Sequence, residues 1–257
     1  MLMKTNRQDA AENLALNNAG NDSPRTDSGR NETGVRQGTV ILLHGLGAGS
    51  WLMSLLAMRL RHSGYDVRIW GYRSIRQSLE SLIDHFTERF RELSQDESIQ
   101  GPIHIVAHSL GSIITREALA QVDLSNVHRI VLLSPPLKGS FFASWVGPYL
   151  MWLSPLIDQL ADREDSFVNR LAGRFPPHVE VGVIAAEWDY VLTERATHLE
   201  NQTDHIVLPS RHTGLVLRRR AADQIRHFLQ YGTFHRAAEQ GTVHRDAAVL
   251  PEMSQSN

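Results

Sequence analysis

Residues 103–111 read Ile-His-Ile-Val-Ala-His-Ser-Leu-Gly and join a short apolar run to the start of a second apolar segment. The first five of these residues are typical of a buried strand, and residues 109–119 are typical of a helix. The small residues Ala107 and Gly111 on either side of Ser109 allow a sharp turn between the two. The sequence therefore predicts a strand, a tight turn and a helix, with the Ser109 hydroxyl exposed at the apex.

Apolar runs alternate with helical patterns on both sides of this turn. The other segments typical of buried strands are residues 39–43, 65–70, 129–133, 179–186 and 205–208. The other segments typical of helices are residues 51–61, 79–93 and 215–231. This alternation predicts an α/β fold with a minimal, mostly parallel sheet of about six strands and helices on both faces. Ligands of such sheets lie beyond the carboxyl ends of the strands, so we expect the chemistry in the loops that follow them.

The composition of the chain fits one large α/β domain and excludes several classes of function. Of its 257 residues, 42% are hydrophobic and 21% are charged, so the chain can bury a sizeable core. The formal net charge of -2 indicates no nucleic-acid partner. Because cysteine is absent, disulfides, thiolate catalysis and iron–sulfur clusters are excluded. We recognise no phosphate-binding loop and no zinc or iron ligand spacing, so we expect no cofactor and no metal.

Polar tails are expected to flank the folded domain. Residues 1–37 are rich in Asn, Asp, Ser, Arg and Gly, which predicts a disordered tail. Residues 38–234 are predicted to form the domain, and residues 235–257 a flexible tail. We recognise no signal peptide and no transmembrane segment, so we expect a cytoplasmic location. The sequence predicts no particular oligomeric state.

A serine at such an apex acts as a nucleophile when a base accepts its proton and an acid orients that base. His212 and Asp189 each follow a predicted strand directly, at its carboxyl end. Glu187 and Asp204 are the alternatives for the acid, and Asp204 precedes its strand, at the opposite edge of the sheet. We interpret Ser109, Asp189 and His212 as a catalytic triad in that chain order.

Two other histidines lie beside these motifs. The sequence contains 13 histidines, so position rather than number selects the base. His44 ends the first predicted strand ahead of several glycines, and we interpret it as structural. His108 is expected to point away from the site if Ser109 points into it.

The glycine-rich loop His44-Gly-Leu-Gly-Ala-Gly49 follows the first predicted strand. The backbone N–H of Leu46 enters the expected site from the side opposite the N–H of Leu110, so the two are candidates for an oxyanion hole. A dinucleotide-binding loop is the alternative. It requires a third glycine where Ser50 stands and an acidic residue at the end of the second strand, and the sequence has neither.

Four motifs resemble those of the serine α/β-hydrolase superfamily and are similar to those of small bacterial lipases and esterases. They are HGLG at residues 44–47, AHSLG at residues 107–111, WDYV at residues 188–191 and RHTGL at residues 211–215. The resemblance covers about residues 38–234 and implies an α/β-hydrolase fold. The sequence departs from the family pattern in two respects. The first two strands of the family's sheet are missing, and the acid loop lacks its usual glycine.

The resemblance implies a lipase- or esterase-type serine hydrolase that cleaves carboxylic esters through an acyl-enzyme. Ser109 would be the nucleophile, Asp189 the acid and His212 the base, with the N–H groups of Leu46 and Leu110 as the oxyanion hole. A thioesterase or an acyltransferase with the same residues is the alternative. A catalytically silent, hydrolase-like binding protein is a second alternative.

Residues 137–178 occupy the place where this superfamily often carries a lid. Within them, residues 139–157 carry no charge and contain Phe141, Phe142, Trp145, Tyr149 and Trp152. A substrate-facing lid and a helical pair packed on the core are both open interpretations. As a lid, the segment would bind an apolar, lipid-like ester through Phe141, Trp145 and Trp152.

The expected partner is a small-molecule or lipid-like ester substrate. The basic run Arg218-Arg219-Arg220 is interpreted as a solvated face of the last predicted helix. Peripheral contact of this run with anionic membrane headgroups is the alternative.

Overall fold

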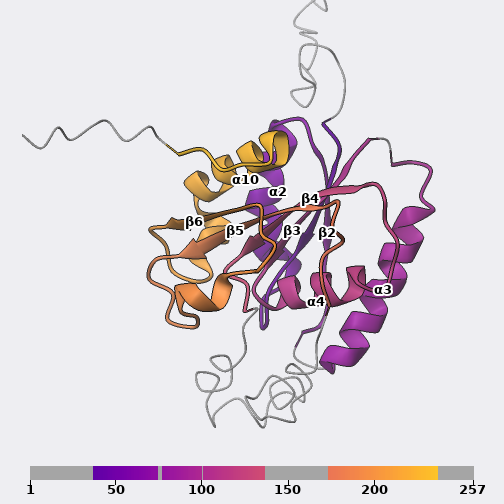
Figure 1. Cartoon of the computed structure of the whole chain (residues 1–257), viewed down its shortest axis with the longest axis horizontal. Coiled ribbons are helices and arrows are strands. Elements are labelled where there is room, and N and C mark those ends of the chain that lie inside the picture. Colours follow the sequence, from indigo (N-terminus) through magenta and orange to yellow (C-terminus); the bar gives the residue numbers. More distant parts are fainter. Residues whose placement is uncertain (1–36, 75–76, 100, 137–172, 237–257) are drawn as a thin grey trace, which may run out of the picture.

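The computed structural model describes residues 37–74, 77–99, 101–136 and 173–236, and these form one parallel sheet between two helical layers (Figure 1). The strands are β1 (Thr39–Leu43), β2 (Asp66–Trp70), β3 (Ile103–His108), β4 (Val127–Leu133), β5 (Glu180–Ala186) and β6 (Asp204–Leu208). Their order across the sheet is β2-β1-β3-β4-β5-β6, and each neighbouring pair is parallel. The predicted fold class is therefore confirmed.

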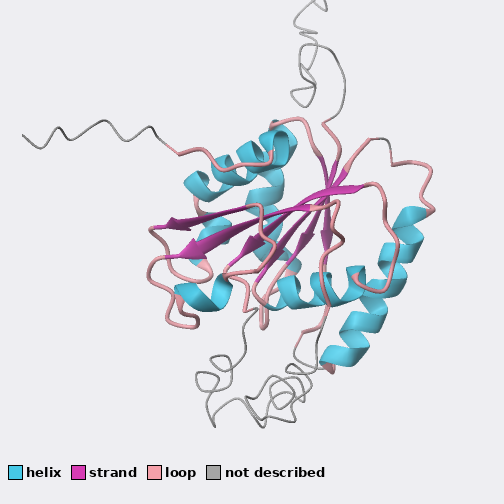
Figure 2. Ribbon diagram, in the orientation of Figure 1, coloured by secondary structure: helices cyan, strands magenta, loops and turns pink. Residues whose placement is uncertain are grey.

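The helices cover both faces of the sheet (Figure 2). On one face lie α3 (Leu79–Ser94) and α4 (Leu110–Leu119). On the other lie α2 (Ser54–His62), α9 (Gly214–Leu217) and α10 (Arg219–Tyr231). Two 3-10 helices, η1 (Ser50–Met53) and η2 (Glu194–Thr197), complete the described elements. No helix among the described residues is long and apolar enough to cross a membrane.

The central strands are apolar throughout because each face of the sheet has its own core. Ile41 and Leu43 of β1 pack with α3 and α4, whereas Val40 and Leu42 pack with α2 and α10. All four side chains have 0% exposure. A strand buried on both faces reads as a continuous apolar run, which is why residues 39–43 are recognisable from the sequence.

The direction of chain winding reverses between β1 and β3. From β1 the chain passes through α2 to β2 on one side, and it then returns through α3 to β3 on the other side. The loops that follow β1 and β3 therefore leave the sheet side by side and diverge to opposite faces. Such a reversal point is where ligands bind in open α/β sheets. The loop after β1 and the turn at Ser109 lie there.

The last helical segment differs from the prediction. A single helix over residues 215–231 was expected, but Arg218 is extended, at φ -75° and ψ 134°, and separates α9 from α10. The break brings Leu215 and Val216 of α9 into the same core as the apolar face of α10. The helical spacing of apolar residues continues across Arg218 and does not predict the break. Packing of both helices on the sheet therefore decides it. Gly232 ends α10 in the left-handed region, at φ 76°, a conformation that glycine adopts without strain.

Several predicted segments lie outside the described residues. These are residues 1–36 and 237–257 of the two tails and residues 137–172 of the insertion, which include Phe141, Trp145 and Trp152. The expectations for the tails, for a lid and for these three aromatic side chains stay predictions.

A Cβ atom at Gly111 would test the contact between α4 and β1. It would lie 2.8 Å from the carbonyl oxygen of His44, closer than real Cβ contacts allow. Alanine gains about 1 kcal/mol of helix propensity over glycine, but the clash with the backbone is expected to dominate. We predict that Gly111→Ala lowers the free energy of unfolding in urea by about 1–3 kcal/mol.

The control for this prediction is Gly49→Ala, because a Cβ atom there meets only the ring of Trp51, which is 75% exposed and can move. Equal stabilities of the two variants would contradict the close approach of α4 to β1.

His104 of β3 gives the fold a testable pH dependence. The side chain is buried, its Nδ1 atom has no partner, and burial together with the nearby His128 and Arg129 lowers its pKa to about 3. The unfolded chain has a histidine pKa of about 6.5, so between these values unfolding takes up a proton. Stability is then present above about pH 6.5 and is lost as the pH falls.

We predict that protonation of His104 on unfolding lowers the unfolding free energy of the wild type by about 2 kcal/mol when the pH falls from 7 to 5. His104→Leu should be less sensitive to pH by that amount in urea unfolding. The exposed His85→Gln serves as the control and should follow the wild type. An equal loss in His104→Leu and the wild type would show that His104 is protonated in the folded state.

Candidate active site

The turn between β3 and α4 holds Ser109 in a backbone conformation that side chains rarely adopt. Its φ is 51° and its ψ is -120°. This conformation costs about 1–3 kcal/mol and persists only where the surrounding structure enforces it. Here the Ser109 N–H donates to the Leu133 carbonyl at 3.0 Å, and the Ser112 N–H donates to the Ser109 carbonyl at 2.8 Å. The predicted strand, sharp turn and helix are all present.

The loop after β1 packs directly against this turn. A Cβ atom at Gly45 would lie 2.9 Å from His108 Nδ1 and 3.0 Å from Ser109 Cβ, so only glycine permits the contact. The close approach places the Leu46 backbone beside the first turn of α4. The N–H groups of Leu46 and Leu110 donate no hydrogen bond to any described residue.

The structure brings His212 and Asp189 together. His212 Nδ1 donates to Asp189 Oδ2 at 2.8 Å, and the Asp189 side chain is only 4% exposed. The other carboxylate oxygen accepts the N–H groups of Val191 at 2.9 Å and Leu192 at 3.1 Å. Burial acts to raise the pKa of Asp189, but these hydrogen bonds and the attraction of His212 hold it below its usual value. The carboxylate is therefore ionised and the orientation of the imidazole is set.

The two alternative acids make no hydrogen bond or ion pair with His212 among the described residues. Asp204, at the start of β6, pairs with Arg236 at 2.5 Å and accepts the Phe234 N–H at 2.8 Å, so it holds the segment after α10. Glu187 is exposed, and its carboxylate makes no hydrogen bond or ion pair with a described residue. Asp189 is the carboxylate that contacts His212.

The sequence analysis expected His108 to point away from the site, but its side chain lies against His212. Its ring centroid lies 4.9 Å from that of His212, and its Nε2 atom lies 3.2 Å from the His212 carbonyl oxygen. Burial and the neighbouring His212 lower its pKa to about 3, so the ring is neutral and Nε2 donates to the carbonyl.

The reason for this difference is the backbone of the turn. β3 extends through His108, whose side chain follows the strand alternation onto the face that α9 covers. The positive φ of Ser109 interrupts that alternation, so His108 and Ser109 both lie against Gly45. An argument from alternation alone places them apart.

His44 and Tyr72 brace the loop after β1. Their rings stack with centroids 4.2 Å apart, the Tyr72 N–H donates to His44 Nε2 at 3.3 Å, and the Tyr72 hydroxyl donates to the His44 carbonyl at 2.5 Å. The Gly47 N–H donates to Ser74 Oγ at 3.0 Å. These contacts agree with a structural role for His44. Sequence reasoning missed Tyr72, although it follows β2 at the same edge of the sheet.

Ser134 is a second residue that sequence reasoning missed. It directly follows β4, has a φ of 42° and donates its N–H to the Ile184 carbonyl at 2.9 Å. Its hydroxyl is buried and makes no hydrogen bond of ordinary geometry, yet it lies close enough to Asp189 to help lower the pKa of that carboxylate. Its place at the carboxyl end of a predicted strand was the available signal.

The structure shows no hydrogen bond between Ser109 and the other two predicted triad residues. The predicted exposure of Ser109 is wrong, because the residue is only 4% exposed; its hydroxyl makes no hydrogen bond to His212 or to another described residue. In ligand-free sites the bond between nucleophile and base is often long and tightens only when substrate binds. The contact of His108 with His212 connects the turn to the base.

Comparisons with known structures identify the fold independently. A lipase of Bacillus licheniformis in its mature form is 16% identical and superposes with a TM-score of 0.60 over 77% of this chain and 92% of that one. An esterase of Pyrococcus furiosus is 16% identical, with a TM-score of 0.55 over 79% of this chain and 83% of that one. At such low identity these similarities show the fold alone. No curated protein sequence matches the chain.

A family model provides the closer assignment. The model described as the alpha/beta hydrolase family matches residues 40–253, which include β1 from Val40 on, the turn at Ser109, Asp189 and His212. The matched range covers most of the chain and agrees with the parallel sheet and with the sharp turn after β3. The protein therefore belongs to the alpha/beta hydrolase family.

Proposed function

We propose that this member of the hydrolase family cleaves carboxylic esters through an acyl-enzyme on Ser109. The observation that carries the proposal is the hydrogen bond of 2.8 Å between His212 Nδ1 and the buried Asp189 carboxylate. This pair lies at the same edge of the sheet as the strained turn at Ser109. A buried carboxylate that orients an imidazole beside a serine at such a turn is the arrangement that activates a serine nucleophile.

His212 is the proposed general base. Since the Nδ1–H of His212 donates a hydrogen bond to Asp189, Nε2 carries no proton and its lone pair can accept the proton of Ser109. Ser109 Oγ then attacks the ester carbonyl, and a bond forms between Oγ and the acyl carbon. The bond between the acyl carbon and the alkoxy oxygen then breaks, and the same proton, returned by His212, leaves with the alcohol. The ionised Asp189 stabilises the imidazolium that exists between the two transfers.

The N–H groups of Leu46 and Leu110 are the proposed oxyanion hole. Both lack an acceptor among the described residues, and Leu110 begins α4, where unpaired N–H groups and the helix dipole favour negative charge. Gly45 and Tyr72 support this role by holding the loop after β1 against the turn. Donors fixed in advance of the reaction stabilise the oxyanion without reorganisation.

Water completes the proposed cycle. His212 removes a proton from water, the hydroxide attacks the acyl-enzyme, and Ser109 recovers its proton as the acid is released. We propose lipid-like esters as the first substrates to test, because residues 139–157 are uncharged and rich in aromatic side chains. The similarity in fold to a lipase and an esterase supports the same choice.

Replacement of the proposed nucleophile should abolish turnover. We predict that Ser109→Ala lowers kcat for p-nitrophenyl esters by about 10³–10⁶. The midpoint of thermal unfolding should not fall, since alanine loses only a hydroxyl that has no hydrogen bond with a described residue. A fluorophosphonate probe should label the wild type at Ser109 and leave the variant unlabelled.

Retention of more than about a tenth of the wild-type rate by Ser109→Ala would refute the acyl-enzyme on Ser109. A folded wild type that hydrolyses no ester and resists the probe would indicate a binding protein instead.

Replacement of the orienting acid should be less severe. We predict that Asp189→Asn lowers kcat by about 10²–10⁴, because an amide in place of the carboxylate favours the wrong imidazole tautomer. Glu187→Gln is the matched control on the same loop and should leave kcat nearly unchanged. Asp204→Asn should act on stability, through the loss of its pair with Arg236, more than on kcat. If Asp204→Asn or Glu187→Gln proved the more damaging to kcat, the acid would be misassigned.

A further inference from the structure

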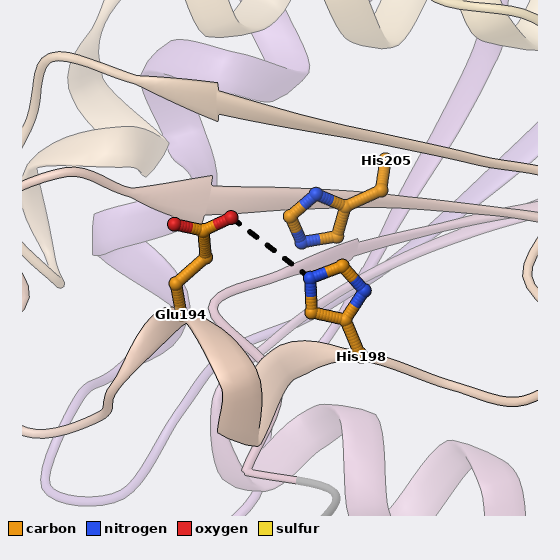
Figure 3. Close-up of side chains that lie close together, drawn as sticks. All are labelled: Glu194, His198 and His205. Carbon is orange, nitrogen blue, oxygen red and sulfur yellow. Dashed lines mark ion pairs between the residues drawn. The ribbon is translucent and has the colours of Figure 1, made fainter.

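A cluster of metal-ligating side chains lies outside the proposed active site (Figure 3). Glu194 belongs to η2, His198 directly follows η2, and His205 lies on β6. One ligating atom from each of the three lies within 4.8 Å of the other two. Glu194 Oε1 is 3.9 Å from His198 Nε2, and the rings of His198 and His205 stack with centroids 4.0 Å apart. Neither the triad nor the proposed oxyanion hole uses these residues.

The donor set indicates the class of ion. Two imidazole nitrogens and one carboxylate oxygen suit Zn²⁺, Co²⁺ and Ni²⁺, whereas Mg²⁺ and Ca²⁺ prefer oxygen ligands throughout. Bonds from zinc to these ligands are about 2.0–2.2 Å long, so the donors of a zinc site lie about 3.3 Å apart. The separation of 3.9 Å between Glu194 and His198 is therefore within a small side-chain adjustment of a coordinating geometry.

The surroundings of the cluster suit a cation that arrives from solvent. The side chains of Glu194 and His198 are 60% and 39% exposed. Glu194 also lines a cavity of about 310 Å³ together with Glu187 and Asp189. The Asp189 carboxylate is bonded to His212, so the exposed carboxylates of Glu187 and Glu194 are the ones that attract cations from solvent here. His205 lies on β6, with its Nε2 atom 3.1 Å from Thr197 Oγ1.

We propose that Glu194, His198 and His205 together bind one divalent transition-metal ion, with water in the fourth position. The ion joins the connection between β5 and β6 to the strand that follows it. That connection also carries Asp189, five residues before Glu194. Its first part is held by the hydrogen bonds of Val191 and Leu192 to Asp189, and the ion holds its second part. The site therefore braces the loop of the proposed acid from the side away from Ser109.

Binding requires one ring to leave the stack. The planes of His198 and His205 are only 15° apart, so their nitrogen lone pairs point in nearly parallel directions, and an ion cannot lie in both ring planes. His198, which is closer to solvent, is the ring that turns. The side-chain amide of Gln202 lies 3.0 Å from His198 Nδ1. The oxygen of the same amide accepts the Leu199 N–H at 3.1 Å, so the amide nitrogen faces His198 and donates to Nδ1. A ring that binds metal through Nε2 carries its proton on Nδ1, so His198 gives up this bond to Gln202 when it turns.

The sequence does not indicate this site. Glu194 and His198 are four residues apart, but His205 belongs to a separate strand, and no recognised ligand spacing links the three. The chain contains 13 histidines, so a histidine near an acidic residue is not informative. The fold selects these three by placing η2 beside β6.

The test is a titration of the full-length, chelator-treated protein with ZnCl₂, followed by calorimetry in a buffer that does not bind zinc. We expect one ion per chain at this site. The double variant His198→Gln/His205→Gln should bind at least about tenfold more weakly. The control His85→Gln, an exposed histidine on α3, should bind as the wild type does. Co²⁺ in place of Zn²⁺ should give a visible spectrum with nitrogen ligands only when both histidines are present.

Glu194→Gln keeps the proposal testable if the double variant does not fold, since this side chain is exposed and its loss leaves the core intact. It should also weaken zinc binding about tenfold. Hydrogen exchange of residues 187–203 should slow on addition of zinc in the wild type and stay unchanged in Glu194→Gln. Binding that survives both sets of substitutions, binding that instead depends on His212, or no binding at millimolar zinc would each overturn the proposal.

Discussion

The left-handed backbone at Ser109 is the constraint on which the rest of the site depends. The strained turn exists because β3 is fixed between β1 and β4, and because the Leu133 carbonyl accepts the Ser109 N–H. Once the turn forms, the first N–H groups of α4 face the carboxyl end of the sheet. The loop after β1 can approach them because Gly45 has no side chain. The stability of a buried parallel sheet thereby offsets the strain of a reactive serine.

The charges of the side chains near this turn are set by burial as well as by hydrogen bonds and ion pairs. Backbone N–H groups and His212 keep Asp189 ionised in a nearly dry position. Burial keeps His108 neutral, directly against the base, so it supports the His212 backbone without placing a second positive charge beside it. An imidazole that gains a proton during turnover is then stabilised by Asp189 and not opposed by its neighbour.

The connection between β5 and β6 ties the family fold to the two proposals. Membership of the alpha/beta hydrolase family accounts for the sheet, the turn and the general class of chemistry. This connection carries the proposed acid near its start and two of the proposed metal ligands, Glu194 and His198, after it, and the third ligand, His205, lies on β6. Among the described strands, β6 lies at the edge of the sheet and pairs only with β5. The connection that leads into β6 is therefore anchored to the sheet on one side. An ion held between η2 and β6 would supply a second attachment at this edge.

The sequence by itself determined the α/β fold, all six described strands to within two residues of each end, and the turn at Ser109. These features depend on apolar periodicity and on small residues near one position, which are local properties. It also singled out Asp189 and His212, because residues after parallel strands converge on one edge.

The tertiary structure alone decided that the last helix breaks at Arg218, that His108 lies against His212, and that Tyr72 and Ser134 belong to the site. It also decided that Glu194, His198 and His205 meet. Each of these depends on contacts between segments far apart in the chain or on one unusual backbone angle, and neither leaves a periodic trace in the sequence.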